Sequence, residues 1–184
     1  MNICSKVCGR GFPILTIHGI ISDHSFFDGI IQYLSQQYTM ISYDRRGYGQ
    51  STSDKIDTYS VSEQVMDAYH VLRRYTDSPA YIVAHSAGSV IALELAICYP
   101  KLVKGLILVE PAFGLASESA ESLKEWNHKL NDYAENRKPS KAFSAFFELA
   151  GVDSNKKMNT ISRAGNMARI KMVMKNLETL CTVN

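Results

Sequence analysis

The sequence has few cysteines, and their spacing is not that of a metal site. Four cysteines are scattered along the 184 residues, at Cys4, Cys8, Cys98 and Cys181. There is no C-x-x-C pair and no histidine at the spacing of a zinc site. Cys4 and Cys8 could form a redox pair, although reduced thiols are the usual state in a cytosolic protein. We therefore expect no metal and no organic cofactor.

Long apolar runs and blocks of basic residues are also lacking. The most apolar stretches, such as residues 90–98 and 105–109, are far shorter than the about 18 to 20 residues that cross a membrane. The 20 Lys and Arg nearly balance the 18 Asp and Glu, and no basic run could follow a phosphate backbone. The first residues do not resemble a signal peptide. We expect a cytoplasmic protein with no membrane or nucleic-acid partner.

The order of hydrophobic patterns predicts an α/β fold. Hydrophobic residues make up 46% and charged residues 21% of the chain, which is ordinary for a globular protein. Up to about residue 112, short apolar runs alternate with amphipathic stretches, whereas the later periodic segments all have helical spacing. This alternation predicts a mostly parallel sheet with helices on both faces in residues 1–112, followed by a helical segment over residues 113–184. The expected strands are residues 3–7, 14–17, 39–43, 80–84 and 105–109.

Three helices are expected between these strands. Ser25 with Asp28, and Ser60 with Glu63, have the spacing of capping boxes at helix N-termini. The first predicted helix buries a face on which residues recur at intervals of four: Phe26, Ile30 and Leu34. The helix over residues 87–98 is apolar almost all round, so we expect it to be covered on most sides.

The segment 84–88 has the composition and context of a nucleophile elbow. The predicted strand 80–84 continues into His85, Ser86, Ala87 and Gly88 and then into a helix, so the motif A-H-S-A-G matches G-x-S-x-G. Such a turn needs small residues two places before and two places after the serine. It raises the Ser86 hydroxyl above the sheet, at a helix start that favours negative charge. Ser86 is therefore the predicted nucleophile; the alternative is that it only caps the helix.

Two further segments accompany this motif. Strand 14–17 ends in His18-Gly19-Ile20, and strand 39–43 is followed at residues 44–51 by D-R-R-G-Y-G-Q-S. In this order and spacing, the three segments resemble the serine-nucleophile, esterase- or haloperoxidase-like branch of the α/β-hydrolase superfamily. The resemblance covers about residues 3–112, and the helical remainder resembles the cap of that superfamily.

The resemblance implies roles for single residues. His18 and Gly19 would shape the oxyanion loop, His85 and Gly88 would support the elbow, and the backbone N–H groups of Ile20 and Ala87 would form the oxyanion hole. The segment 44–51 would be structural, with Arg45 and Arg46 solvated or in salt bridges. Haloalkane dehalogenases and epoxide hydrolases have an aspartate at the nucleophile position, so Ser86 indicates an ester, thioester or amide substrate.

A serine nucleophile also needs a base and an acid, which the superfamily supplies in the order serine, acid, histidine. The one histidine after Ser86 is His128, on a predicted cap helix, whereas the superfamily's catalytic histidine follows the last strand. Glu110, at the end of the strand after the elbow helix, is the best candidate acid. Its alternative is a loop residue in a common Glu-Pro strand end.

These gaps lead us to expect a shortened chain. The superfamily's sheet continues after the cap through two more strands, which carry the usual acid and the histidine. Without them, strand 105–109 would be an uncovered apolar edge, and such edges pair with other chains, so self-association is expected. The functional expectation is a serine hydrolase of a small-molecule acyl substrate, incomplete because its histidine is absent. The alternatives are a non-catalytic small-molecule binding protein and an inactive truncated product.

Overall fold

The computed structural model describes residues 2–51 and 60–111, and short stretches of a second unit: residues 124–126, 128–129, 132–133, 136, 138, 141 and 144–145. The chain divides into two compact units, Met1–Phe113 and Gly114–Asn184. In the second unit, residues 124–126, 128–129, 132–133, 141 and 144–145 are helical. The predicted domain boundary after residue 112, and most of the predicted cap, lie outside the described residues.

The first unit is built on a mostly parallel sheet, as the sequence predicts. The described strands are β1 (Ser5–Cys8), β2 (Phe12–Ile17), β3 (Tyr38–Tyr43), β4 (Ala80–His85) and β5 (Val103–Val109). They lie in the order β1-β3-β2-β4-β5, and only β1 runs antiparallel to its neighbour among these strands. Each predicted strand is present, with ends that differ by one or two residues.

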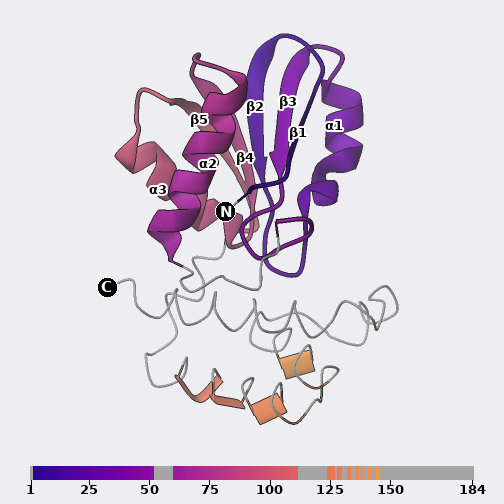
Figure 1. Cartoon of the computed structure of the whole chain (residues 1–184), viewed down its shortest axis with the longest axis vertical. Helices are drawn as coiled ribbons and strands as arrows, with labels where there is room; N and C mark the ends of the chain where they lie inside the picture. The colour runs from indigo at the N-terminus through magenta and orange to yellow at the C-terminus, as the bar shows by residue number, and fades with distance from the viewer. Residues whose placement is uncertain are drawn as a thin grey trace. The chain divides into compact units, whose positions relative to one another are not determined.

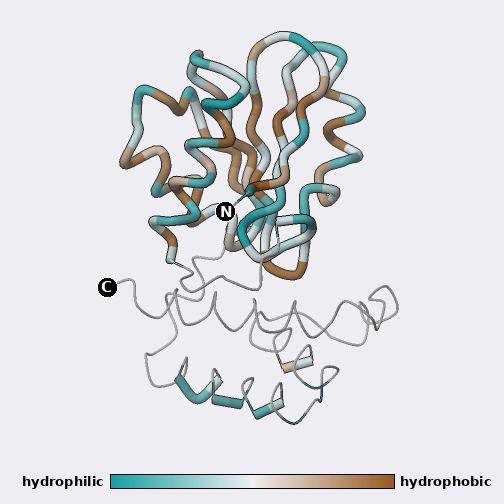
Figure 2. The backbone as a smooth tube through the Cα atoms, in the orientation of Figure 1, coloured by the Kyte–Doolittle hydropathy of each residue, from teal (hydrophilic) through white to brown (hydrophobic). Residues whose placement is uncertain are grey.

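Helices cover both faces of this sheet (Figure 1). The 3-10 helix η1 (His24–Phe27) and α1 (Asp28–Leu34) lie on one face, and α2 (Val61–Tyr75) and α3 (Gly88–Cys98) lie on the other. The larger core joins strand residues such as Leu15, Ile41 and Ile82 to Leu72 of α2 and Leu95 of α3. Figure 2 shows hydrophobic residues concentrated along the central strands, as expected for strands buried on both faces.

One of the two predicted capping boxes is confirmed and the other is wrong. The Ser60 side chain accepts a hydrogen bond from the Glu63 N–H, and the Glu63 carboxylate accepts one from the Ser60 N–H. In the first helix, by contrast, Asp23 is the cap and accepts from the Ser25 N–H. Residues 24–27 form a 3-10 turn, whose three residues per turn shift the buried face relative to an α-helix.

The buried face of the first helix differs from the prediction at two of its three positions. Phe27 is buried in a core against which Ile31 and the predicted Leu34 pack, whereas Phe26 and Ile30 are 50% and 45% exposed. On α3, Leu93, Ile97 and Cys98 are exposed and the other residues are buried or half-buried, so the expectation that this helix is covered on most sides is confirmed.

β5 is the last strand of the described sheet, and Ile107 and Val109 on it are 55% and 40% exposed. Self-association through this edge stays a prediction. Cys4, Cys8 and Cys98 are free thiols, so Cys4 and Cys8 form no disulfide in this structure. No helix in the described part of the chain is long and apolar enough to span a membrane.

The parallel strands bring four segments of the sequence to one edge of the sheet. His18, Asp44, Ser86 and Glu110 directly follow β2, β3, β4 and β5, respectively. The chain passes from β2 to β3 on one side and reaches β4 on the other side of β2. Open α/β sheets bind ligands where the strand order changes direction in this way, outside the carboxyl ends of the strands. The loops after β2 and β4 therefore define the candidate site.

Candidate active site

Ser86 lies in a strained turn between β4 and α3. Its φ angle is 51°, in the left-handed region that residues with a Cβ rarely adopt. The Ser86 N–H donates to the Val109 carbonyl at 2.9 Å, and the Ser86 carbonyl accepts from the Ser89 N–H at 2.9 Å. The N-cap of α3 is Ala87, with no side-chain capping bond. The turn thus has the form of an elbow, and the half-buried Ser86 does not cap the helix through its side chain.

Glycine is required where the loop after β2 approaches this elbow. A Cβ on Gly19 would lie 3.0 Å from the Ser86 Cβ and 2.9 Å from His85 Nδ1. A Cβ on Gly88 would lie 2.5 Å from the Ile17 carbonyl oxygen. All three distances are below ordinary van der Waals contact, so the two predicted support positions have a steric reason to be glycine.

The two amides predicted for the oxyanion hole flank this contact. Ile20 directly follows Gly19, and Ala87 directly follows Ser86. Within the described residues, neither backbone N–H donates to a protein acceptor. Ile21, the next residue in the loop, has a φ angle of 60°, which is an outlier for a β-branched side chain. Unpaired N–H groups beside a serine are the donors that an oxyanion needs.

His18 anchors the start of this loop. The buried ring accepts a hydrogen bond from the Arg45 N–H at Nε2, 3.0 Å away, and its Nδ1 lies 2.8 Å from the Gly19 carbonyl oxygen. Since Nε2 accepts, Nδ1 carries the hydrogen and donates. Burial, followed by the nearby Arg45 charge, lowers the pKa of His18 to about 3. The ring is therefore neutral and fixed in one tautomer.

The sequence analysis predicted that Arg45 is either solvated or in a salt bridge, and the prediction of a solvated side chain is wrong. The Arg45 side chain is buried, with Nε 2.9 Å from Gln64 Oε1 and Nη1 3.2 Å from the His18 carbonyl oxygen. Arg46 does form salt bridges, with Glu63 and Asp67, each at 2.6 Å. The burial of Arg45 could not be predicted from the sequence, because its polar partners come from distant segments of the chain.

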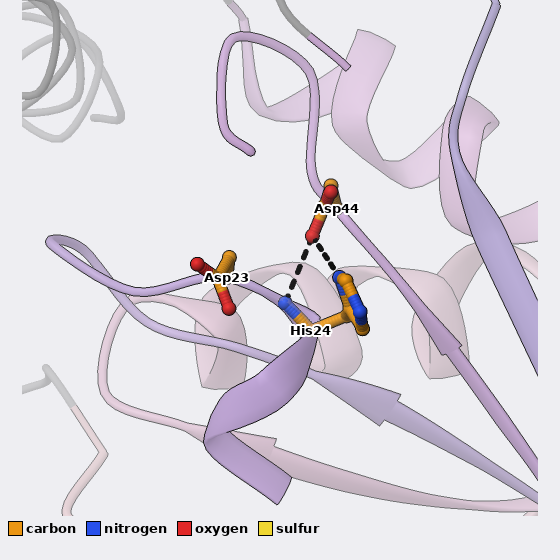
Figure 3. Close-up of side chains that lie close together, drawn as sticks. All are labelled: Asp23, His24 and Asp44. Carbon is orange, nitrogen blue, oxygen red and sulfur yellow. Dashed lines mark hydrogen bonds and ion pairs between the residues drawn. The ribbon is translucent and has the colours of Figure 1, made fainter. Parts of the chain in front are cut away.

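Asp44 and His24 form a second connection that the sequence analysis missed. Asp44 Oδ1 accepts hydrogen bonds from the His24 N–H at 2.9 Å and from His24 Nδ1 at 2.6 Å, and both are drawn in Figure 3. Asp44 Oδ2 accepts from the Gln50 N–H at 2.8 Å. Burial raises the pKa of Asp44, but these hydrogen bonds outweigh burial and hold the pKa below its usual value.

These two residues and Asp23 also supply three potential metal-ligand atoms within 4.8 Å of one another. The Asp44 oxygens, however, already accept three hydrogen bonds from protein donors, and Asp23 accepts from Ser25. A metal ion would have to displace these bonds. The donor set therefore fits a hydrogen-bonded pair of Asp44 and His24, which we call the clamp, better than it fits a metal centre.

Glu110 faces His85 beside the nucleophile. Glu110 Oε2 lies 3.3 Å from His85 Nε2, and the Glu110 side chain is 80% exposed. The His85 ring also stacks on Phe26 of η1, with 4.4 Å between ring centroids. Within the described residues, His85 Nδ1 has no hydrogen-bond partner. His85 thus links the elbow, η1 and Glu110.

The structure does not bring a base to Ser86 within the described residues. The Ser86 hydroxyl makes no hydrogen bond to any of them. His128 is an exposed helical residue of the second unit. The roles predicted for Ser86, Glu110, Ile20 and Ala87 are therefore carried forward as proposals.

Comparison with known proteins is consistent with this geometry. Residues 13–169 match the family described as alpha/beta hydrolase fold. An uncharacterized hydrolase, YraK, from Bacillus subtilis (strain 168) is 32% identical over 166 residues, which are 90% of this chain and 60% of YraK. This chain thus spans less than two thirds of the length of that relative.

Solved structures show the same fold. An α/β hydrolase from Sphaerobacter thermophilus DSM 20745 has a TM-score of 0.78 and 18% identity, covering 98% of this chain and 70% of that one. Est816, described as an N-acyl homoserine lactone degrading enzyme, has a TM-score of 0.69 and 26% identity, covering 95% of this chain and 61% of that one. The sheet order, the serine turn and the family match together show that the chain belongs to the α/β-hydrolase fold family.

Proposed function

We propose that this chain carries the nucleophile and oxyanion hole of a serine hydrolase that acts on a small-molecule ester, thioester or amide. The observation that carries the proposal is the strained backbone of Ser86, with φ of 51°, between β4 and α3. Strain of this kind costs about 1 to 3 kcal/mol and persists where the surrounding structure holds it, often at functional sites. The relation to YraK, named as a hydrolase, supports the general activity.

The nucleophile decides between hydrolase classes. An aspartate at this position forms the ester intermediate of epoxide hydrolases and haloalkane dehalogenases, whereas residue 86 is a serine. A serine attacks a carbonyl carbon that bears a leaving group. The likeness to Est816, whose described substrate is a lactone and so a cyclic ester, supports the acyl class.

In the proposed reaction, the Ser86 Oγ forms a bond to the carbonyl carbon and transfers its proton to a base. The carbonyl oxygen becomes an oxyanion, and the N–H groups of Ile20 and Ala87 donate hydrogen bonds to it. When this intermediate collapses, the base returns the proton to the leaving group, which departs as a neutral alcohol, thiol or amine, and water then releases the acid from the acyl-serine. Losing one such oxyanion donor typically costs about 3 to 4 kcal/mol of transition-state stabilisation.

The base is the unassigned part of this proposal, and the acid is proposed to be Glu110. The superfamily uses a histidine, and His128 is the one histidine after Ser86 in the sequence. Glu110 is the proposed acid because it follows β5, whose last residue is bonded to the Ser86 N–H. A chain without the base would retain only the contribution of the oxyanion hole and of substrate binding, as triad variants do.

The second candidate function is a binding protein that keeps the site without turnover. The observation that favours it is that the Ser86 hydroxyl has no hydrogen-bonded base among the described residues. In that case, acyl compounds would bind beside the elbow and leave unchanged.

A fluorophosphonate probe distinguishes the two functions. We expect the probe to label the 184-residue chain at Ser86, as located by peptide mass spectrometry, far more slowly than it labels a serine hydrolase with a complete triad, and not to label Ser86→Ala. Ser78→Ala, an exposed serine between α2 and β4, is the matched serine control and should be labelled like the wild type. Labelling of a folded wild-type chain that is no faster than that of Ser86→Ala would overturn the hydrolase proposal.

A further inference from the structure

Two consecutive residues hold both ends of the oxyanion loop, which we define as Gly19–Asp23. At its start, the Arg45 N–H donates to His18 Nε2 at 3.0 Å, and Arg45 Nη1 donates to the His18 carbonyl at 3.2 Å. At its end, Asp44 Oδ1 accepts from the backbone N–H and the ring of His24 (Figure 3). The end of β3 therefore fixes the loop that follows β2.

The loop needs such anchors because its own conformation is unfavourable. Ile21 has a φ angle of 60°, in the left-handed region that is unfavourable for a residue with a Cβ and most so for a β-branched one. Neither the Ile20 nor the Ile21 N–H donates to an acceptor within the described residues. The loop is therefore held by its two ends rather than by internal backbone bonds.

Asp44 is well placed to be a rigid anchor. Its carboxylate is fully buried and accepts three hydrogen bonds, two from His24 and one from the Gln50 N–H. Gly49 approaches so closely that a Cβ there would clash with Asp44 Oδ2. This packing leaves the carboxylate little room to rotate away from His24.

We propose that Asp44, acting through His24, is a positioning residue that holds the oxyanion loop in the strained form that presents the Ile20 N–H to the substrate oxygen. The inference rests on the proposed function for its catalytic consequence, but the clamp itself is a property of the fold. Oxyanion donors act only when they are fixed at hydrogen-bond distance from the developing charge, so a looser loop lowers the rate of attack more than it lowers binding.

Hydrogen exchange tests the clamp without any catalytic readout. Because Asp44→Ala would leave three hydrogen-bond donors without their acceptor in a buried site, the clamp is broken from its less buried side with His24→Leu. We expect at least tenfold faster exchange in the peptide covering residues 18–25 and unchanged exchange in β4. His24→Asn, whose amide N–H can replace the Nδ1 donor, should restore most of the protection.

Asp67→Asn is the matched control, because Asp67 loses its ion pair with Arg46 but does not contact the loop. This variant should leave exchange in residues 18–25 at the wild-type rate. Equal loop exchange in His24→Leu and in the wild type would overturn the clamp.

Inactivation kinetics test the catalytic consequence. For the fluorophosphonate, His24→Leu should lower the maximal rate of Ser86 labelling at least tenfold and change the apparent affinity less than threefold, with recovery in His24→Asn. If the wild type is not labelled at all, the proposed function fails while the exchange result still decides the clamp. If the wild type and His24→Leu are labelled alike although their loop exchange differs, the positioning role is wrong.

Discussion

His18 Nε2 accepts a hydrogen bond from the Arg45 backbone N–H at 3.0 Å, in a site where the imidazole is almost fully buried. A protonated ring would have no lone pair at Nε2 for this N–H and would bring its charge next to the Arg45 guanidinium. Burial and this neighbouring charge lower the pKa of His18 to about 3. The start of the oxyanion loop therefore depends on a neutral histidine.

The first prediction concerns the pH dependence of stability. Between pH 6.5 and pH 3, the unfolded chain binds a proton at His18 that the folded chain does not bind. The free energy of unfolding should therefore fall as the pH decreases through this range, by about 1.4 kcal/mol per pH unit from this group. In His18→Gln, that contribution is absent, and urea unfolding followed by circular dichroism at pH 7.5, 5.5 and 4.5 should show a shallower slope.

His70→Gln provides the control for this experiment, because His70 is exposed on α2. It should keep the wild-type slope. Parallel slopes for the wild type and His18→Gln would contradict the neutral, buried state that the hydrogen bonds require.

The second prediction uses two neighbouring isoleucines that differ in backbone conformation. Ile20 and Ile21 are both partly buried, but only Ile21 has a positive φ angle. Glycine removes a side chain at either position but relieves strain only at residue 21. We expect Ile21→Gly to be more stable than Ile20→Gly by about 1 to 2 kcal/mol in urea unfolding. Equal losses in the two variants would mean that the Ile21 conformation is not strained.

The sequence predicted the sheet and the elbow because both follow from local patterns. Buried parallel strands are short apolar runs, and a strand that runs through A-H-S-A-G into a helix has few other structures available to it. The resemblance then placed Gly19 and Gly88, which the structure explains by close backbone approach to Ser86 and Ile17.

The clamp could not be predicted in the same way, because its partners are far apart in the sequence. Asp44 is 20 residues from His24, and Arg45 is 19 residues from Gln64. Nothing in a single sequence says which histidine a buried carboxylate will contact. The capping box predicted at Ser25 is wrong for a local reason: Asp23, also a good N-cap residue, caps the 3-10 helix η1 instead.

The third prediction tests Glu110 as the acid. Its carboxylate contacts His85 rather than a base histidine in the described part of the chain. If it orients the base in the reacting enzyme, Glu110→Gln should slow labelling of Ser86 at least tenfold without changing the fold. We expect this result, with Asp77→Asn, which removes a fully exposed carboxylate, as the unaffected control. A labelling rate within twofold of the wild type would show that Glu110 is a loop residue that only contacts His85.

The fourth prediction compares two glycines, one with no space for an added Cβ and one with open space around it. A Cβ on Gly88 would meet the Ile17 and His18 carbonyl oxygens at 2.5 and 2.7 Å, which are main-chain atoms of the strand end that leads into the oxyanion loop. Gly88→Ala should therefore destabilise the fold by about 1 to 3 kcal/mol through overpacking. It should also slow labelling of Ser86, because the oxyanion loop must move away from the elbow.

Gly29 lies in α1, where an added Cβ would meet nothing within 4 Å. Gly29→Ala should raise the free energy of unfolding by about 0.5 to 1 kcal/mol, because alanine loses less backbone entropy than glycine in a helix. Thermal unfolding and probe labelling of Gly88→Ala and Gly29→Ala, measured side by side, check that the first variant is less stable than the wild type and the second is more stable. The same stability change in both would contradict the close contact between the elbow and the oxyanion loop, since only that contact distinguishes Gly88 from an ordinary helical glycine.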